Sequence, residues 1–295
     1  MNRRKKDALI KSCFLGIAIS GILVLFLIMS FLFMEGVPVF KHVSVSDFLF
    51  GKLWYPTAEP PDFGILPMIA GSVAVTALSS LMAIPLGIMT AIYLAEIATP
   101  TMRNIVKPTV EMLGAFPSVV IGFFGMVVVA PFLQDVFGID TGLNLLNASV
   151  MLAFMAVPII TSLAEDAIFS VSNELREASL ALGATQWQTI ARVIIPASLS
   201  GISTAIILGM ARAIGETMVV LMVAGGAALI PISIFDPVRP MPASIAAEMS
   251  EAPFRSDHYY ALFATGLVLF CITLLFNLVA AYIAEKKKQV GTATL

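Results

Sequence analysis

Six apolar stretches follow one another along the chain, and they constrain its fold more than any other feature. Their ranges are 13–34, 68–95, 109–132, 145–168, 199–229 and 260–284. A helix of about 20 residues matches the hydrocarbon core of a bilayer. Because that core offers no hydrogen-bonding partners, a spanning segment has to satisfy its own backbone groups. We therefore expect an all-α, polytopic membrane protein with six transmembrane helices.

The composition agrees with a chain that lies largely in a membrane. Hydrophobic residues make up 59% of its 295 positions and charged residues 12%, against about 25% charged residues in soluble domains. Cys13 and Cys271 form neither a disulfide framework nor a zinc-binding pattern. His42 and His258 stand alone in polar connections, where we expect ordinary loop residues. The sequence thus predicts no metal site.

Basic residues set the expected orientation. Of the 17 lysines and arginines, 12 lie in the terminal segments and in the second and fourth connections, and four lie in the first and fifth. Since basic loops stay in the cytoplasm, we expect both termini there. Residues 3–6 are basic, as at the start of a signal peptide, but the apolar stretch that follows is too long and lacks a cleavage pattern.

The same pattern predicts how the chain is divided. Cytoplasmic segments at 1–12 and 285–295 flank a transmembrane domain at 13–284, with its core at 68–284. The outer loops at 35–67 and 230–259 are long and rich in proline and aromatic residues, so we expect ordered caps. Three stretches contain an internal proline: Pro85, Pro117 and Pro158. Each predicts a kink, serving either helix packing or a hinge.

Arg212 and Glu216 are ionisable residues inside the fifth stretch. A charge at the bilayer centre costs roughly 2.5–3.5 kcal/mol, so two of them need a reason. At a spacing of four, both side chains would share one helix face and could touch. A stripe of small residues beside them would let a neighbouring helix approach closely. The members of this stripe are Gly201, Ala205, Gly209, Ala213 and Thr217. We expect the pair near the middle of the membrane, at the edge of a helix contact.

The cytoplasmic connection at 165–197 contains too many helix formers to be a flexible linker. Residues 173–183 combine strong helix formers with early acidic residues, and Gly183 ends the helix. Residues 186–195 continue as a second short amphipathic helix before Pro196. Such an element is typical of a docking surface for a soluble partner. An amphipathic segment lying on lipid is the alternative.

The same connection resembles the EAA loop of bacterial ABC importer permeases. That pattern is Glu-Ala-Ala, three residues, Gly, nine residues and Ile-x-Leu-Pro. This chain has Glu177-Ala178-Ser179, Gly183 and Val193-Ile194-Ile195-Pro196. The three departures are replacements of similar volume. The resemblance implies a type I ABC importer permease fold and a loop that couples the chain to a separate ATPase. The implied coupling residues are Glu177, Ala178, Gly183 and Pro196.

The sequence around Arg212 resembles a narrower group of permeases. Residues 211–218, Ala-Arg-Ala-Ile-Gly-Glu-Thr-Met, are similar to the fifth-helix motif of phosphate-specific permeases. Residues 35–40, 63–67 and 117–125 resemble sequences that flank their first three spans. With its long first outer loop, the chain is most similar to permeases of the PstC type. The paralogous PstA type, or a permease for another oxyanion such as molybdate, is the alternative.

The resemblance also implies partners and a location. They are a paralogous PstA-like permease subunit, two copies of a PstB-like ATP-binding subunit and a PstS-like extracytoplasmic phosphate-binding protein. ATP and magnesium would be bound by the ATPase, so we expect no cofactor in this chain, which has no Gly-x-x-x-x-Gly-Lys-[Ser/Thr] motif. The expected ligand is inorganic phosphate, with no nucleic acid, in a multi-pass protein of the bacterial inner membrane.

In such a permease, Arg212 would offer forked donors to a phosphate oxyanion. Glu216 would hold Arg212 in an empty site and keep binding weak enough for release, with Thr217 beside them on the pathway. Thr204 and Ser203 are secondary polar candidates. The alternative is a structural salt bridge in which the two charges only neutralise each other.

Two other classes of function are also considered. An autonomous carrier would use Glu216 as a proton site, and the EAA-like loop argues against it. An intramembrane hydrolase would need a nucleophile with a partnered base, and the stretches contain no such arrangement. We therefore expect no catalytic residues and a transport subunit rather than an enzyme.

Overall fold

The fold is known from a computed structural model, which describes residues 3–288, so the expected terminal segments lie partly outside the described residues. Six of its helical segments are long and apolar enough to cross a membrane. They are Ile10–Lys41, Leu66–Ile97, Ser118–Phe137, Leu145–Phe169, Gln186–Ile214 and Asp257–Tyr282. The prediction of a helical protein with six spans is confirmed. The only strands in the described part of the chain are the short β1 (Trp54–Tyr55) and β2 (Asp62–Phe63).

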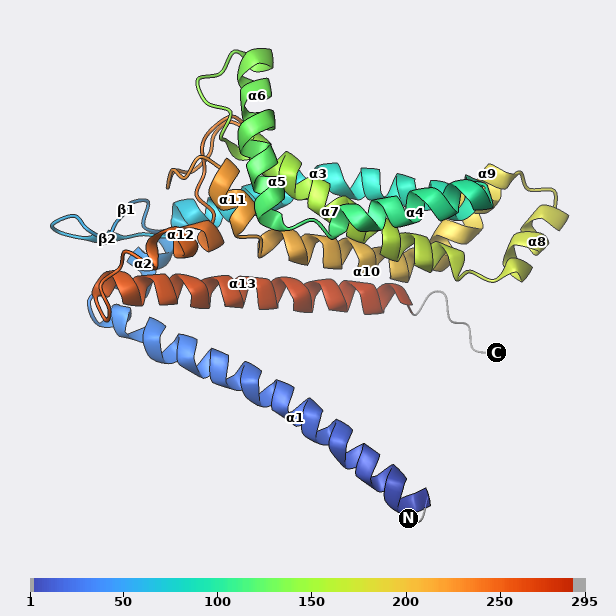
Figure 1. The fold of residues 1–295 in the computed structure, drawn as a ribbon, viewed down its shortest axis with the longest axis horizontal. Helices are drawn as coiled ribbons and strands as arrows, with labels where there is room; N and C mark the ends of the chain where they lie inside the picture. The colour runs from blue at the N-terminus through green and yellow to red at the C-terminus, as the bar shows by residue number, and fades with distance from the viewer. Residues whose placement is uncertain (1–2, 289–295) are drawn as a thin grey trace.

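The centre of the bundle is α7 (Leu145–Phe169), which packs between α3 (Leu66–Ile92) and α10 (Ile195–Ile214). Figure 1 shows these helices and α13 (Asp257–Lys288) running side by side along the long axis. In the most apolar window of α7, 72% of the residues are buried, compared with none in the corresponding window of the first helix. Apolar residues that would face lipid in an isolated helix therefore form the protein core here.

Glycines let the three central helices approach closely. A Cβ atom added to Gly87 of α3 would lie 2.7 Å from Ile160 Cγ2, and one added to Gly209 of α10 would lie 2.5 Å from Ile160 Cγ1. Ile160 of α7 thus fits between two glycines. In the predicted small-residue stripe, Ala205, Gly209 and Ala213 are buried. The expected close helix contact is confirmed, and its partner is α7.

The third span does not follow the predicted range 109–132. An amphipathic helix, α4 (Pro100–Gly114), ends before Pro117, and a new helix starts at Ser118. The second piece comprises α5 (Ser118–Phe124), the π-helical turn η3 (Gly125–Val129) and α6 (Ala130–Phe137). The residue before a proline is pushed out of the helical region, so Pro117 breaks the segment rather than kinking it. Pro85 and Pro158 do lie inside helices, as predicted.

The fifth span also differs from its predicted range of 199–229. It begins at α9 (Gln186–Thr189), passes through the π-helical turn η4 (Ile190–Ile194) and ends with α10 at Ile214. The wide π turn lies directly before Pro196, which has no N–H for a regular helical bond. After a break at 215–217, the short α11 (Met218–Val223) packs into the core. Val219, Val220 and Val223 of α11 are therefore buried in protein, and this segment does not extend the spanning helix.

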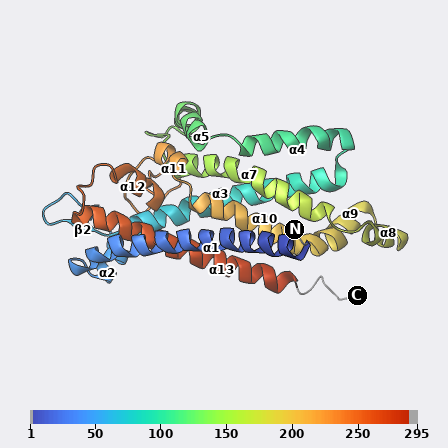
Figure 2. The same cartoon turned by 60° about the horizontal axis from the view of Figure 1, so that its bottom comes forward.

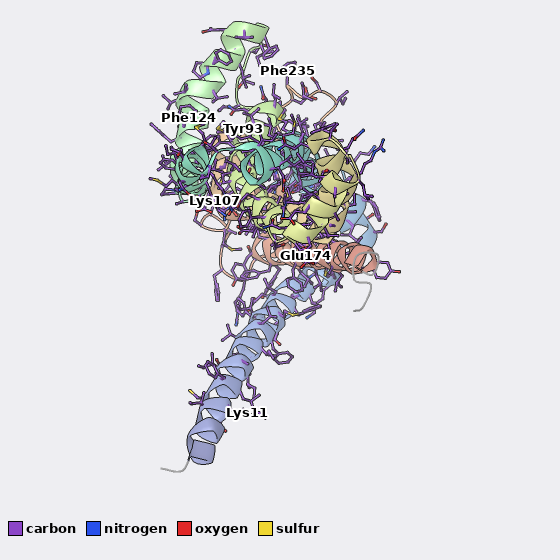
Figure 3. The ribbon with its side chains drawn as sticks, turned by 90° about the vertical axis from the view of Figure 1, so that its right-hand side faces the viewer. Lys11, Tyr93, Lys107, Phe124, Glu174 and Phe235 are labelled. Atoms are coloured by element: carbon purple, nitrogen blue, oxygen red, sulfur yellow. The ribbon has the colours of Figure 1, made fainter. Side chains whose placement is uncertain are left out.

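The first helix, α1 (Arg3–Gly36), touches the rest of the chain mainly near its C-terminal end. There Phe31 stacks edge-on against Phe263 of α13, with ring centroids 5.5 Å apart. From this contact α1 diverges from the bundle (Figure 1). Figure 3 shows Lys11 of α1 well away from the bundle that carries Lys107 and Glu174.

The two long loops predicted at 35–67 and 230–259 lie at the end of the bundle opposite α9 (Figure 1), and they are bonded to each other. They form η1 (Val37–Lys41), α2 (Val45–Phe50), the β1–β2 hairpin and α12 (Met241–Glu248). The Glu248 carboxylate accepts a hydrogen bond from Trp54 Nε1 at 2.9 Å and lies 2.8 Å from His258 Nε2. It also pairs with Arg239. His258 is therefore not the isolated loop residue that the sequence predicted, because it helps to join both loops to α13.

Candidate functional site

The predicted coupling loop forms a compact helical unit. Its first helix, α8 (Asn173–Ala181), ends at Gly183, which has a φ of 84° and so a left-handed conformation. The Gly183 N–H bonds to Leu180 O at 2.9 Å and the Ala184 N–H to Ser179 O at 3.2 Å, as in a Schellman C-cap. Thr185 and Gln188 then form a capping box at the start of α9. The sequence prediction of two helices separated by a glycine is confirmed.

The two helices of the loop enclose a groove of about 520 Å³. Ala178 and Gly183 line it together with Leu175, Leu182 and Val193. Leu182 is 90% exposed, which leaves an apolar side chain available to a partner. Of the other predicted coupling residues, Glu177 is exposed on α8 and Pro196 lies outside the groove at the start of α10. The structure thus brings together two of the four residues.

Arg212 is exposed on α10, near the end of that helix. It belongs to a row with Thr204 and Leu208, also exposed, that is offset by one residue from the buried stripe. One residue corresponds to about 100° around a helix. The buried stripe faces α7, and the row of Arg212 therefore emerges at the edge of that contact. Because an arginine is costly against lipid, this face requires a polar or protein environment.

Glu216 lies outside α10, in the break between α10 and α11. The expectation that it shares a helix face with Arg212 is therefore wrong, because the helix ends at Ile214. Within residues 3–288 no ion pair joins the two side chains, so the structure shows neither the expected hold of Glu216 on Arg212 nor the alternative structural salt bridge. Glu216 Oε1 instead accepts a weak bond of 3.4 Å from the Val219 N–H. Thr217, half-buried, is the N-cap residue of α11.

The two interrupted helical segments lie next to each other. α5, which follows the break at Pro117, packs on α11, which follows the break at Gly215. A Cβ atom added to Gly122 of α5 would lie 2.8 Å from Met222 Sδ of α11. Irregular backbone at membrane depth is tolerated where it is buried in protein or lines a water-filled cavity. Arg212 lies one turn before the second of these breaks, whose backbone groups also need a polar surrounding.

Glu165 is a buried charged residue that the sequence analysis did not identify. Its side chain is fully buried at the end of α7 and pairs with Arg103 and Lys107 of α4. Lys107 also lies 2.7 Å from Asp166, whose side chain is 60% exposed. The available signal was an acidic residue at the end of an apolar stretch, and its cations had been interpreted only as markers of orientation.

Comparison with known proteins assigns the family. The family model of the binding-protein-dependent transport system inner membrane component matches residues 83–289, which is more than half of the chain. The chain belongs to this family. It is therefore a multi-pass inner-membrane component of a transport system, and not an enzyme. The two alternative functions, an autonomous carrier and an intramembrane hydrolase, are inconsistent with membership of this family.

Two curated relatives illustrate the similarity in sequence. The probable ABC transporter permease protein YqgH of Bacillus subtilis is 41% identical over 260 residues, covering 88% of this chain and 84% of the relative. The phosphate transport system permease protein PstC of Mesorhizobium japonicum is 37% identical over 256 residues, covering 80% and 77%.

Two solved structures show the same fold. The chain matches a bacterial ABC transporter involved in the import of alginate with a TM-score of 0.66 and 16% identity, over 96% of each chain. It matches the MetNI methionine ABC transporter with a TM-score of 0.59 and 21% identity, over 74% of this chain and 93% of the other. The predicted importer permease fold is confirmed.

Proposed function

We propose that this chain is a permease subunit of an ATP-driven phosphate importer and forms one half of its translocation path. The observation that carries this proposal is the exposed Arg212 in an otherwise apolar span, without an ion-pair partner in the described part of the chain. A guanidinium is always charged and presents a fork of donors that suits phosphate. The similarity to PstC permeases supports phosphate as the anion.

The second half of the path is supplied by a paralogous, PstA-like subunit. The row of α10 that carries Arg212 and Thr204 is exposed in the single chain. Leaving Arg212 against lipid would cost roughly 2.5–3.5 kcal/mol. A second permease subunit on this face removes that cost and encloses a polar passage. Glu216, half-buried near Arg212 in sequence, lowers the affinity of the passage for an anion and so permits release.

ATP-driven movement enters through the groove between α8 and α9. Its exposed apolar lining suits a PstB-like ATPase, with one of two copies bound here. In Figures 1 and 2, α1 begins and α13 ends towards the same end of the molecule as α8 and α9. We assign this end to the cytoplasm because most basic residues belong to it. The opposite end, with its ordered loops, receives a PstS-like binding protein.

Uptake by a reconstituted complex tests this function. The chain is co-expressed with its candidate partners, purified in mild detergent and placed in liposomes loaded with ATP, with the binding protein outside. We expect ATP-dependent phosphate uptake that excess molybdate or sulfate does not inhibit, and no flux from this chain alone. If molybdate inhibits the uptake of labelled phosphate more strongly than unlabelled phosphate does, the natural substrate is another oxyanion. Robust flux from the isolated chain would contradict the proposal.

A further inference from the structure

Arg176 joins the coupling loop to two spans. Its Nη2 atom lies 2.7 Å from Glu96 Oε1 and donates to Ile168 O at 3.1 Å, while Nη1 donates to Val171 O. Glu96 belongs to the π-helical turn η2 (Tyr93–Ile97), which continues α3, and Ile168 belongs to the end of α7. The side chains of Arg176 and Glu96 are only 19% and 9% exposed, respectively. One guanidinium therefore connects α8, α3 and α7.

Glu96 of the η2 turn is bound through its side chain and also through its backbone carbonyl. The Glu96 backbone carbonyl accepts a bond of 3.3 Å from Gln186 Nε2 of α9, so both helices of the loop are attached to the same turn. Four residues later α4 begins at Pro100. α4 is in turn held to α7 by the pairs of Glu165 with Arg103 and Lys107. A displacement of η2 therefore has to move α3 and α4 together.

Apolar packing alone does not hold α8 in place. No residue of α8 is fully buried, whereas η4, on the same loop, buries Ile190 and Ile194. A helix with so little buried surface would shift against the bundle when a partner pushed on it, unless polar bonds held it. Arg176 supplies such bonds, and it points towards Glu96 rather than into the groove lined by Ala178 and Leu182.

We propose that the Arg176–Glu96 pair is the joint that transmits movement of the coupling loop to α3 and α4. Arg176 is a positioning residue that acts through Glu96 and does not touch the transported anion. The inference rests on the proposed function, because it takes the groove between α8 and α9 as the ATPase docking surface. The Arg176–Glu96 pair lies outside the docking surface. Without it, the ATPase would still dock on the groove, but its movement would no longer reach the spans.

The test uses the assembled complex with three variants and one control. Arg176→Ala removes all the bonds, Glu96→Gln removes only the charge, and Arg176→Lys keeps a charge but loses the fork. Glu174→Gln removes an exposed carboxylate from the same helix and is the matched control. Phosphate transported per ATP hydrolysed is measured, together with co-purification of the ATPase. Spin labels at Ala181→Cys of α8 and Asn104→Cys of α4, after replacement of Cys13 and Cys271, report the loop-to-α4 distance with and without ATP.

With the joint intact, we expect the label distance to stay the same when ATP binds. In Arg176→Ala and Glu96→Gln the distance should change with ATP, and transport per ATP should fall at least about fivefold, the lower end of usual coupling effects. Arg176→Lys should lie between these variants and wild type. The ATPase should still co-purify, and Glu174→Gln should behave as wild type.

Unchanged transport per ATP and an unchanged label distance in Arg176→Ala would overturn the proposal. Loss of ATPase binding would also overturn it, because Arg176 would then belong to the docking surface. If the label distance stays constant in wild type and changes with ATP in Arg176→Ala and Glu96→Gln but no phosphate moves, the joint stands and the assignment of phosphate fails.

Discussion

Ile160 of α7 fills the space over Gly209 of α10, where a Cβ atom would lie only 2.5 Å from Ile160 Cγ1. This contact fixes the rotation of α10 against the bundle. With the row of Gly209 turned towards α7, the row of Thr204, Leu208 and Arg212 remains on the surface. The position of the candidate anion-binding arginine thus follows from the packing of a glycine one turn earlier.

The first prediction concerns this packing. Gly209→Leu should destabilise the protein by about 1–3 kcal/mol, because added side-chain atoms overfill a close contact. Thermal unfolding in detergent measures the effect. Gly21→Leu is the matched control, since no atom lies within 4 Å of a Cβ at Gly21 on α1. Equal melting temperatures for the two variants would show that α10 and α7 do not pack as described.

The second prediction concerns the buried carboxylate that holds α4. Glu165→Gln leaves Arg103 without its charge partner and leaves Lys107 only the exposed Asp166, and breaking a buried pair costs about 3–5 kcal/mol. Because both cations are about a quarter exposed, we expect a loss at or below the lower end of this range. Asp166→Asn is the control: its side chain is 60% exposed, and exposed pairs contribute only about 0–1 kcal/mol. Denaturant unfolding should separate the two variants, and similar losses would refute the buried pair.

The third prediction concerns the turn of the coupling loop. Gly183→Ala places a side chain at a φ of 84°, which costs roughly 1–2 kcal/mol and should distort the end of α8. Nothing lies within 4 Å of the added Cβ, so the effect comes from backbone strain. ATP hydrolysis should continue while phosphate uptake falls. Gly138→Ala also places a side chain at a positive φ, 62°, after α6 and should leave coupling unchanged, whereas normal coupling in Gly183→Ala would argue against the docking role.

The spans could be predicted from the sequence because twenty apolar residues carry a strong signal. The ends of the spans could not be predicted where only a short break interrupts the helix. The residues of α11 are as apolar as a spanning helix, yet they pack into the core, and only Gly215 marks the separation. At Pro117 the signal was present, but a proline in an apolar stretch is compatible with a kink as well as with a break.

The candidate site was predicted in part. Arg212 was identified because a charge in an apolar stretch is conspicuous, but its pairing with Glu216 assumed a continuous helix. The ion pairs of Glu165 with Lys107 and of Arg176 with Glu96 join residues 58 and 80 positions apart. No local pattern predicts such pairs, since they depend on which helices become neighbours in the fold.

Phosphate uptake by liposomes containing the assembled importer with Arg212→Ala tests the central role of this residue most directly. We expect uptake to be lost, by at least about tenfold, since a charge-assisted contact contributes about 1.5–3 kcal/mol. ATPase association should remain normal. Arg212→Lys should retain a fraction of the activity, and Lys11→Ala, which removes an exposed cation from α1, should have no effect. Normal uptake by Arg212→Ala would contradict a role for this arginine in the passage of phosphate.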